Sequence, residues 1–419
     1  MLKTILRREH KNRWERRVAI SPTAAGQLKS QGFQLDVESS EDRIYTDATY
    51  EAEDLQITDT PHLHQLVLGI KEPPIESIQE HQVHLCFSHT IKGQDYNMPL
   101  LQRFLDQDAT LIDYELMKDE RGIRTIAFGR FAGIAGAIDT LWLYAQILQR
   151  ENTQTILSEM TQSWEYGSVA SAETKLSAID INRDKRPLRI IVLGNGKVGM
   201  GCAEVCRWLG LPEISAEAIA AGHYDDEHHW FSVLDVSEMY AKDDGSDFDR
   251  DEYYQYGKAK YHSRFKEMLG HCDVVLMSSF WTEEFPRHME LDDFAQYANV
   301  LPKILGDISC DISGAFACTM KVTDIENPVY TFFPQSRTIE DGLHDAGLPI
   351  MAIDNLPCEL SKDASDHFSS VLSSHLPDLM TMDMKQDFEQ LQLNAEIKDS
   401  IIVYRGELTP NFKYLEQYL

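Results

Sequence analysis

The sequence predicts an α/β protein with two Rossmann-like domains, each with a parallel sheet, and a cleft between them. Strand-like apolar runs alternate with helical segments along the chain, which is typical of parallel sheets covered by helices. One of these runs, Leu188–Leu193, leads directly into a glycine-rich turn and a helix. The length of 419 residues also fits more than one domain.

The N-terminal part supplies most strands of the first predicted sheet. Ser21 and Pro22 open a helix, because serine caps a helix start and proline fits its first turn. Gly32 ends that helix, and a second helix is expected over residues 99–107. Strands are expected at residues 2–8, 33–37, 64–70, 84–88 and 109–114.

A long helix is expected at residues 131–151, with small residues in its first turns that permit close backbone contact. The apolar run around it contains Arg130 and Asp139, so a buried helix is favoured over a membrane span. Residues 152–187 are polar and are interpreted as a linker. Further strands are expected at residues 188–193, 230–234, 272–277 and 300–308.

These elements predict two domains. Residues 1–130 together with 355–419 form the substrate (catalytic) domain, and residues 131–354 form the dinucleotide-binding Rossmann domain.

Composition excludes several classes of protein. The chain has 39 Lys and Arg against 68 Asp and Glu, a formal charge of −29, which argues against nucleic acid and anionic membranes as partners. Seven scattered cysteines form no CxxC pair, and the N-terminus has no apolar signal region. We therefore expect a cytoplasmic protein without a metal site, and the oligomeric state stays open.

The glycine-rich turn is the clearest local motif. Gly194, Gly196 and Gly199 follow the strand at 188–193, with Lys197 and Val198 between the last two glycines. The first glycine permits the tight turn, the second lets the backbone approach a pyrophosphate, and the third lets helix and strand pack closely. The motif predicts NAD or NADP as cofactor.

An acidic residue after the second strand normally binds the adenosine ribose. Glu213 lies at the usual spacing, but Asp235 follows a better strand end. An acid there repels a 2′-phosphate and so favours NAD. The acidic segment 243–252 fails the EF-hand spacing and is interpreted as a solvated insertion.

Candidate acid/base groups follow two strands of the first sheet. Lys71 and His89 lie where ligands bind in open α/β sheets, and Asp113 and Glu115 follow a third strand. A lysine in a cleft beside other cations has a lowered pKa and can serve as a base. Seven of the first 17 residues are basic, as expected of a site for an anionic small molecule. The alternative is that these lysines, arginines and histidines have structural or solvated roles.

Several motifs resemble lysine-ketoglutarate reductase and, more distantly, saccharopine dehydrogenase (L-lysine-forming), within the alanine dehydrogenase/transhydrogenase group. They run nearly end to end: RREHKNRWERRVAISP at 7–22, LGIKEPP at 68–74, FSHTIKGQDYNMPLLQ at 87–102, LIDYELMKDERGIRTIAFGRFAGIAGAID at 111–139, SSFWTEEFPR at 278–287, LGDISCDISG at 305–314, NPVYTFFP at 327–334 and AIDNLPCELSKDAS at 352–365.

The resemblance implies a reductase that joins L-lysine and 2-oxoglutarate to give saccharopine, with a nicotinamide cofactor. It implies Lys71 and His89 as the acid/base pair. It assigns substrate-side positions to Arg17, Lys92, Glu115, Arg130 and Phe131, and places Phe131 and Asp307 toward the nicotinamide.

Alternatives remain at this level. The plant and animal reductases use NADPH, whereas Asp235 favours NAD. Another opine-type or amino-acid dehydrogenase, with a different amine or keto acid, would keep the same motifs. A non-catalytic nucleotide sensor on this fold would lack the acid/base candidates, and this chain has both.

Overall fold

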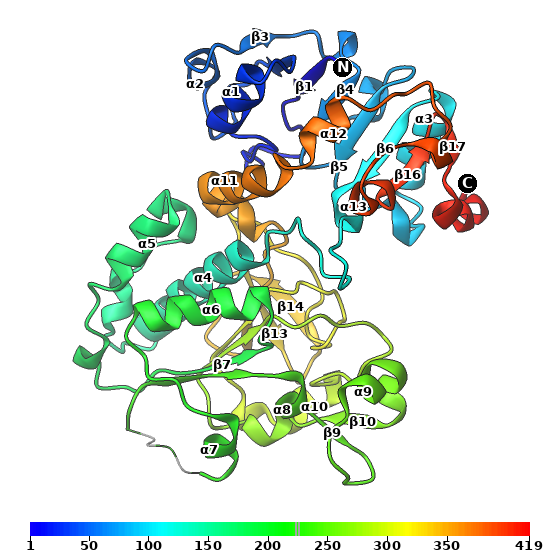
Figure 1. Cartoon of the computed structure of the whole chain (residues 1–419). Helices are drawn as coiled ribbons and strands as arrows, with labels where there is room; N and C mark the ends of the chain where they lie inside the picture. Colours follow the sequence, from blue (N-terminus) through cyan, green and yellow to red (C-terminus); the bar gives the residue numbers. More distant parts are fainter. Residues whose placement is uncertain (223, 225–226) are drawn as a thin grey trace. The chain divides into compact units, whose positions relative to one another are not determined.

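The computed structural model describes residues 1–222, 224 and 227–419, which form two compact units (Figure 1). Unit 1 comprises Met1–Phe128 and Ser361–Leu419, and unit 2 comprises Gly129–Leu360. The sequence placed these boundaries at 130/131 and 354/355. The predicted assignment of substrate and dinucleotide roles to the two domains, and of a cleft between them, stays a prediction.

Unit 1 is built on one sheet, with the strand order β17-β16-β6-β5-β4-β1-β2-β3. The six strands from β6 to β3 in this order are parallel, and the C-terminal β16 and β17 add an antiparallel edge. Their bounds are β1 (Thr4–Leu6), β2 (Leu35–Glu38), β3 (Gln56–Thr58), β4 (Leu66–Leu68), β5 (Val83–Cys86), β6 (Thr110–Asp113), β16 (Ile401–Tyr404) and β17 (Glu407–Leu408).

Helices from both ends of the chain cover this sheet. They are α1 (Pro22–Ser30), α2 (Asp47–Glu51), α3 (Met98–Asp106), α11 (Ser361–Leu372), α12 (Leu376–Met380) and α13 (Ala395–Lys398). As predicted, Ser21 caps α1, accepting from the amide of Ala24. Phe368 and Leu372 of α11 pack in one core with Leu6 and Leu68, so the C-terminal segment completes unit 1.

Unit 2 contains a seven-stranded sheet in the order β14-β13-β15-β12-β11-β7-β8. The strands β15, β12, β11, β7 and β8 are parallel, and β13 and β14 are antiparallel. Their bounds are β7 (Arg189–Leu193), β8 (Trp230–Leu234), β11 (Val274–Met277), β12 (Ile304–Asp307), β13 (Val329–Phe333), β14 (Thr338–Asp341) and β15 (Leu348–Met351). The two mostly parallel sheets confirm the predicted fold class.

The long helix α4 (Gly129–Arg150) packs closely against α6 (Lys197–Trp208). A Cβ added at Gly133 would lie 1.9 Å from the Val198 carbonyl oxygen, and one at Gly201 would lie 2.3 Å from that of Arg130. Only glycine permits this approach, as the small residues predicted. By length and composition α4 could cross a membrane, but 78% of its apolar window is buried inside the protein. It is therefore described as a core helix.

The remaining helices of unit 2 are α5 (Val169–Leu176), α7 (Ala216–Ala220), α8 (Val236–Met239), α9 (Arg250–Tyr256) and α10 (Leu291–Gln296). The interpretation of residues 152–187 as a linker is wrong. This segment contains α5 and folds onto unit 2, where α5 contacts α6 and the buried Ser163 binds Asp139 of α4. Its polar composition masked buried residues such as Ile156, Leu157 and Leu176.

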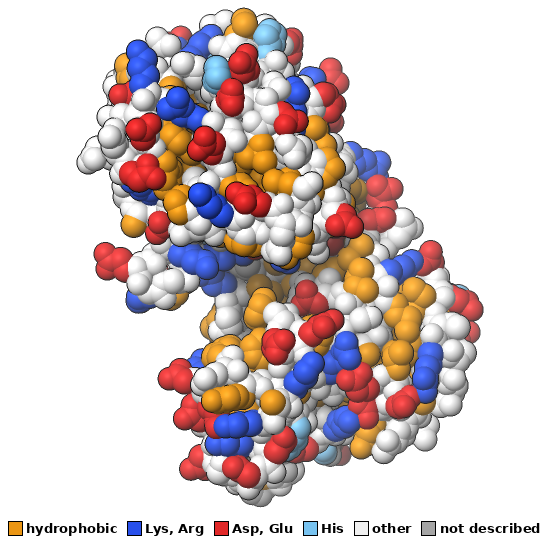
Figure 2. Space-filling model, turned by 90° about the vertical axis from the view of Figure 1, so that its right-hand side faces the viewer, with side chains coloured by type: hydrophobic (Ala, Val, Ile, Leu, Met, Phe, Trp, Pro, Cys, Tyr) orange, Lys and Arg blue, Asp and Glu red, His pale blue; other side chains and the backbone are white. Residues whose placement is uncertain are grey.

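Surface ion pairs neutralise some of the acidic side chains. Arg207 and Glu213 lie 2.9 Å apart, and Lys362 and Asp366 lie 3.0 Å apart. Figure 2 shows Lys and Arg side chains interspersed with Asp and Glu over the face that it presents. Charges of both signs are therefore mixed on this face.

Candidate active site

The predicted acid/base groups of unit 1 lie at the same edge of its sheet. Lys71 follows β4, His89 follows β5 and Glu115 follows β6, and these three strands are adjacent and parallel. Arg17 lies in the loop that follows β1, the neighbour of β4. The carboxyl ends of parallel strands meet at one edge, so the topology gathers these four residues.

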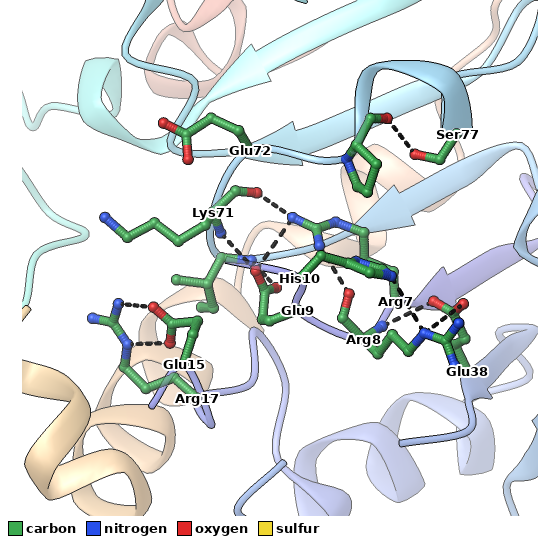
Figure 3. A network of polar contacts seen from close by, with 12 residues as sticks. Arg7, Arg8, Glu9, His10, Glu15, Arg17, Glu38, Lys71, Glu72 and Ser77 are labelled. Carbon is green, nitrogen blue, oxygen red and sulfur yellow. Dashed lines mark hydrogen bonds and ion pairs between the residues drawn. The ribbon is translucent and has the colours of Figure 1, made fainter. Parts of the chain in front are cut away.

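The backbone around Lys71 is held by two buried charged side chains (Figure 3). The Glu9 carboxylate accepts hydrogen bonds from the amides of Ile70 at 2.7 Å and Lys71 at 3.0 Å. The Arg7 guanidinium donates to the Lys71 carbonyl and lies 3.3 Å from Glu9. Arg7 also lies against Gly69, where a Cβ would come within 2.3 Å of its Nε. This arrangement fixes the direction in which the Lys71 side chain leaves the strand end.

The environment of Lys71 favours its neutral form. Burial lowers the pKa of Lys71 first, and the positive charges of Arg17 and Lys11 lower it further. Glu15 and Glu72 oppose this without cancelling it. A lowered pKa increases the fraction of unprotonated amine, which is the form that can take a proton from a ligand.

His89 is held by Glu72, which follows Lys71 in the chain. Nδ1 of His89 makes a short hydrogen bond with Oε1 of Glu72. Partial burial raises the pKa of Glu72, but the hydrogen bond from His89 and its charge lower it overall. Glu72 is thus an acceptor, so Nδ1 donates and Nε2 is the nitrogen that can exchange a proton with a ligand.

The backbone at His89 is strained. Its φ is 54°, in the left-handed region that costs a non-glycine residue roughly 1–2 kcal/mol. Asn97 donates from its side chain to the His89 carbonyl at 3.1 Å. Such strain is concentrated at functional sites, where the surrounding contacts hold it.

Arg17 is buried and bound by Glu15 through two parallel hydrogen bonds of 2.7 and 2.5 Å (Figure 3). Its guanidinium also lies 4.2 Å from the centre of the Phe128 ring. The loop that carries it is tied to α11, because Ser365 accepts from the Val18 amide at 2.9 Å. The arginine is therefore oriented before any ligand arrives.

Glu115 has a buried carboxylate oxygen, Oε2, that has no hydrogen-bond partner among the described residues. Its other oxygen lies 3.5 Å from Arg124. Asp113 has a structural role instead, since its carboxylate accepts from the amides of Ser88 at 3.0 Å and Glu115 at 2.7 Å. An unpaired buried acceptor favours a ligand that brings a donor, such as an ammonium group. Lys92, three residues after His89, is exposed.

The glycine-rich turn of unit 2 has the geometry of a dinucleotide site. Gly194 has φ 115°, and a Cβ at Gly199 would lie 1.8 Å from the Gly194 carbonyl oxygen. Nothing lies within 4 Å of a Cβ added at Gly196, so its backbone is open to a ligand. Gly196 caps α6 without a side chain, and the first amides of α6, from Lys197 and Val198, come next. These residues fit a pyrophosphate.

The second strand of this sheet distinguishes the two candidate ribose acids. Asp235 directly follows β8, which pairs with β7, whereas Glu213 lies at an isolated bridge to Phe231 and pairs with Arg207. Asp307, the last residue of β12, is buried and binds Thr319 at 2.6 Å. Burial raises the pKa of Asp307, and its hydrogen bonds only partly offset this.

Two substrate-side candidates lie in unit 2. Arg130 and Phe131 belong to the first turn of α4, so Arg130 is not part of the unit that carries Lys71, contrary to the predicted boundary. Arg130 makes a bidentate pair with Glu204 of α6, at 2.8 and 2.6 Å. Phe131 is buried.

Sequence reasoning missed the residues that orient the predicted ones. These are Arg7, Glu9, Glu15, Glu72 and Phe128. Glu72 adjoins Lys71, and Glu9 and Glu15 are the acids within the basic N-terminal segment. This nearness in sequence to the predicted site residues was the signal that could have found them. It does not reveal which cation each acid binds.

The two mostly parallel sheets form a fold similar to that of alanine dehydrogenase. A solved L-alanine dehydrogenase is 14% identical with a TM-score of 0.64 and covers 99% of both chains. A transhydrogenase from Sinorhizobium meliloti is 14% identical with a TM-score of 0.58, covering 97% of this chain and 99% of that one. Residues 5–135 match the family Alanine dehydrogenase/PNT, N-terminal domain.

Within that type, the chain is homologous to saccharopine dehydrogenase and α-aminoadipic semialdehyde synthase, which confirms the predicted resemblance. Alpha-aminoadipic semialdehyde synthase of Arabidopsis thaliana is 31% identical over 96% of this chain. The chain spans 40% of that relative's length. Saccharopine dehydrogenase [NAD(+), L-lysine-forming] of Emericella nidulans is 24% identical over 90% of this chain and 92% of its own. The name of this relative supports the predicted oxidoreductase class.

Proposed function

We propose that the chain is a lysine-ketoglutarate reductase, that is, a saccharopine dehydrogenase (L-lysine-forming). It would condense the side-chain amine of L-lysine with the keto group of 2-oxoglutarate and reduce the product to saccharopine, reversibly. The observation that carries the proposal is the set of Lys71, His89 and Arg17 at adjacent strand ends of unit 1. The names of the relatives support the substrates.

Unit 2 would hold the nicotinamide cofactor. Gly194 and Gly199 permit the tight turn, Gly196 leaves room for the pyrophosphate, and the amides of Lys197 and Val198 at the start of α6 would bind it. The cofactor, when bound, supplies or accepts the hydride. Phe131 and Asp307 remain proposed positions on the nicotinamide side.

Unit 1 would carry the proton transfers. The amine of lysine must be neutral to attack the keto carbon, and the lowered pKa of Lys71, caused first by burial, makes it the base that accepts the ammonium proton. Loss of water from the addition product requires a proton on the leaving hydroxyl. His89, with Nδ1 held by Glu72, would donate that proton from Nε2.

Charged side chains of unit 1 would orient the substrates. The buried Arg17 and the exposed Lys92 suit the carboxylates of 2-oxoglutarate, because guanidinium binds carboxylate in a fixed geometry. The unpaired Oε2 of Glu115 suits the ammonium group of lysine. Correct orientation of both substrates is a large part of the rate enhancement of a two-substrate reaction.

The test follows oxidation of the reduced cofactor at 340 nm by the purified protein, with lysine and 2-oxoglutarate together and each omitted in turn. NADH and NADPH are run in parallel. Turnover that requires both substrates is expected. Turnover with another amine or keto acid would replace this proposal by the opine-type alternative, and nucleotide binding without turnover would favour the sensor.

Two substitutions test the assignment of residues. Lys71→Met and His89→Gln are expected to lower kcat at least a hundredfold, within the range that acid/base groups contribute. Lys29→Met, at the half-buried end of α1 where Lys29 pairs with Asp54, and His62→Gln, at an exposed position, are the matched controls. Full activity of either site variant would remove its proposed role.

A further inference from the structure

Asp235 does not offer the free carboxylate that a ribose-binding acid usually presents. Oδ1 accepts from the Ser237 amide at 2.7 Å and from the Ser237 hydroxyl. Oδ2 accepts from Arg250 at 2.6 Å and from the Asn195 side chain at 3.4 Å. Partial burial raises the pKa of Asp235, but these hydrogen bonds lower it overall, so the carboxylate is charged and its acceptor sites are used.

Arg250 comes from the acidic segment 243–252, which the sequence marked as an insertion. The segment is ordered as part of a small substructure with β9 (Tyr240–Lys242) and β10 (Tyr261–Ser263), which lie close to α8 and α9 in Figure 1. Glu252 binds Lys242 at 2.5 Å and Lys260 at 2.6 Å. Ion pairs of Glu252 thus stabilise the insertion, and the ion pair of Arg250 with Asp235 links it to the end of β8.

The acids beside Arg250 are largely engaged. Asp249 caps α9 and accepts from the Glu252 amide at 2.9 Å. Asp243 lies 2.7 Å from His262. Asp244 accepts from the Ser246 amide at 3.0 Å. Their charges are therefore partly satisfied within the insertion.

We propose that Arg250 is the residue that selects a 2′-phosphorylated dinucleotide, by neutralising Asp235 and presenting its guanidinium to the phosphate. This inference rests on the proposed dinucleotide site of unit 2. An uncovered Asp235 would repel a 2′-phosphate, and Arg250 cancels that negative charge and adds N–H donors. A guanidinium has five N–H donors, and the contact with Asp235 is made through Nη2 of a side chain that is 56% exposed. Its outward donors suit phosphate oxygens.

The assay measures binding of two fragments that report only on this end of the site, 2′,5′-ADP and 5′-AMP, by isothermal titration calorimetry. The full chain is expected to bind 2′,5′-ADP more tightly than 5′-AMP. Arg250→Gln is expected to weaken 2′,5′-ADP about 10- to 100-fold, the effect of losing a charge-assisted contact. Its affinity for 5′-AMP should change by less than about twofold.

Arg207→Gln is the matched control. Arg207 also forms a surface ion pair in unit 2, with Glu213 at 2.9 Å, but lies at the end of α6 remote from the glycine-rich turn. It should leave both affinities unchanged. Asp235→Asn keeps a good helix cap and removes the repelling charge, so it should tighten 2′,5′-ADP.

The outcomes separate the two proposals. If neither fragment nor an intact dinucleotide binds the full chain, the dinucleotide site itself is refuted, and this inference with it. If both fragments bind equally, or Arg250→Gln weakens both to the same extent, the dinucleotide site stands and the role of Arg250 is wrong.

Discussion

Asp139 and Glu359 are two carboxyls buried side by side in unit 2. The Ser163 amide donates to Oδ1 of Asp139 at 2.8 Å, and the Ser163 hydroxyl donates to Oε2 of Glu359 at 2.6 Å. The remaining oxygens, Oδ2 and Oε1, have no donor among the described residues, although the two side chains are in hydrogen-bonding contact. One shared proton would satisfy both, so we expect the pair to hold it at neutral pH.

The size of the effect follows from the pKa of Asp139. Burial raises it from 3.8 to about 6, and the charge of Glu165 raises it too. A raised carboxyl pKa stabilises the folded state below the unfolded value and loses that contribution as the pH rises through the folded value. The rise to about 6 is a loss of about 3 kcal/mol over the whole titration, of which about 1.4 kcal/mol falls between pH 5 and pH 8.

Asp139→Asn should remove this contribution, because it removes the buried group that titrates. The amide oxygen still accepts from the Ser163 amide, and the amide nitrogen can donate to Glu359, which then has no like charge beside it. Calorimetric melting at pH 5 and pH 8 is the measurement. The difference in melting temperature between the two pH values should shrink by roughly 3–6 °C, at 2–4 °C per kcal/mol for a unit of this size.

Glu283→Gln, an exposed acid of unit 2, is the matched control and should leave the difference unchanged. If Asp139→Asn lowers the melting temperature equally at both pH values, Asp139 does not titrate in this range and the reasoning is refuted.

Three further predictions concern the proposed sites. Arg17→Gln removes a positive charge that, after burial, lowers the pKa of Lys71, so the rise of kcat/KM with pH should move to higher pH; an unmoved profile would contradict the role of Lys71 as base. Gly199→Ala would bring a Cβ within 1.8 Å of the Gly194 carbonyl oxygen, and dinucleotide affinity should fall at least tenfold while far-ultraviolet circular dichroism is retained. Glu115→Gln should raise KM for the amine substrate roughly tenfold, with KM for the keto acid as internal control.

The sequence predicted the strand ends better than their surroundings. Lys71, His89 and Asp235 could be placed because an apolar run ends just before each, and parallel strands end at a common edge. The partners of these residues could not be placed, because contacts such as His89–Glu72 and Asp235–Arg250 depend on side-chain direction and on loop paths. Local composition carries little information about either.

The polar composition of residues 152–187 led to the wrong interpretation as a linker for a related reason. The segment is polar overall, yet its few apolar side chains fall on the faces that meet α4 and α6. A short helix such as α5 has too few residues for its periodicity to stand out. The predicted solvated insertion at 243–252 is likewise ordered by ion pairs that only the fold brings together.

The division of unit 1 into two chain segments affects the order in which the protein can form during synthesis. Unit 2 is continuous in sequence and can fold as soon as its own residues have emerged from the ribosome. Unit 1 must wait, since β16 pairs with β6 and Ser365 of α11 holds the loop of Arg17. The strand ends that carry Lys71 and His89 would therefore be exposed and incomplete while unit 2 is translated. The groups proposed for proton transfer in unit 1 would thus be assembled after unit 2 has folded.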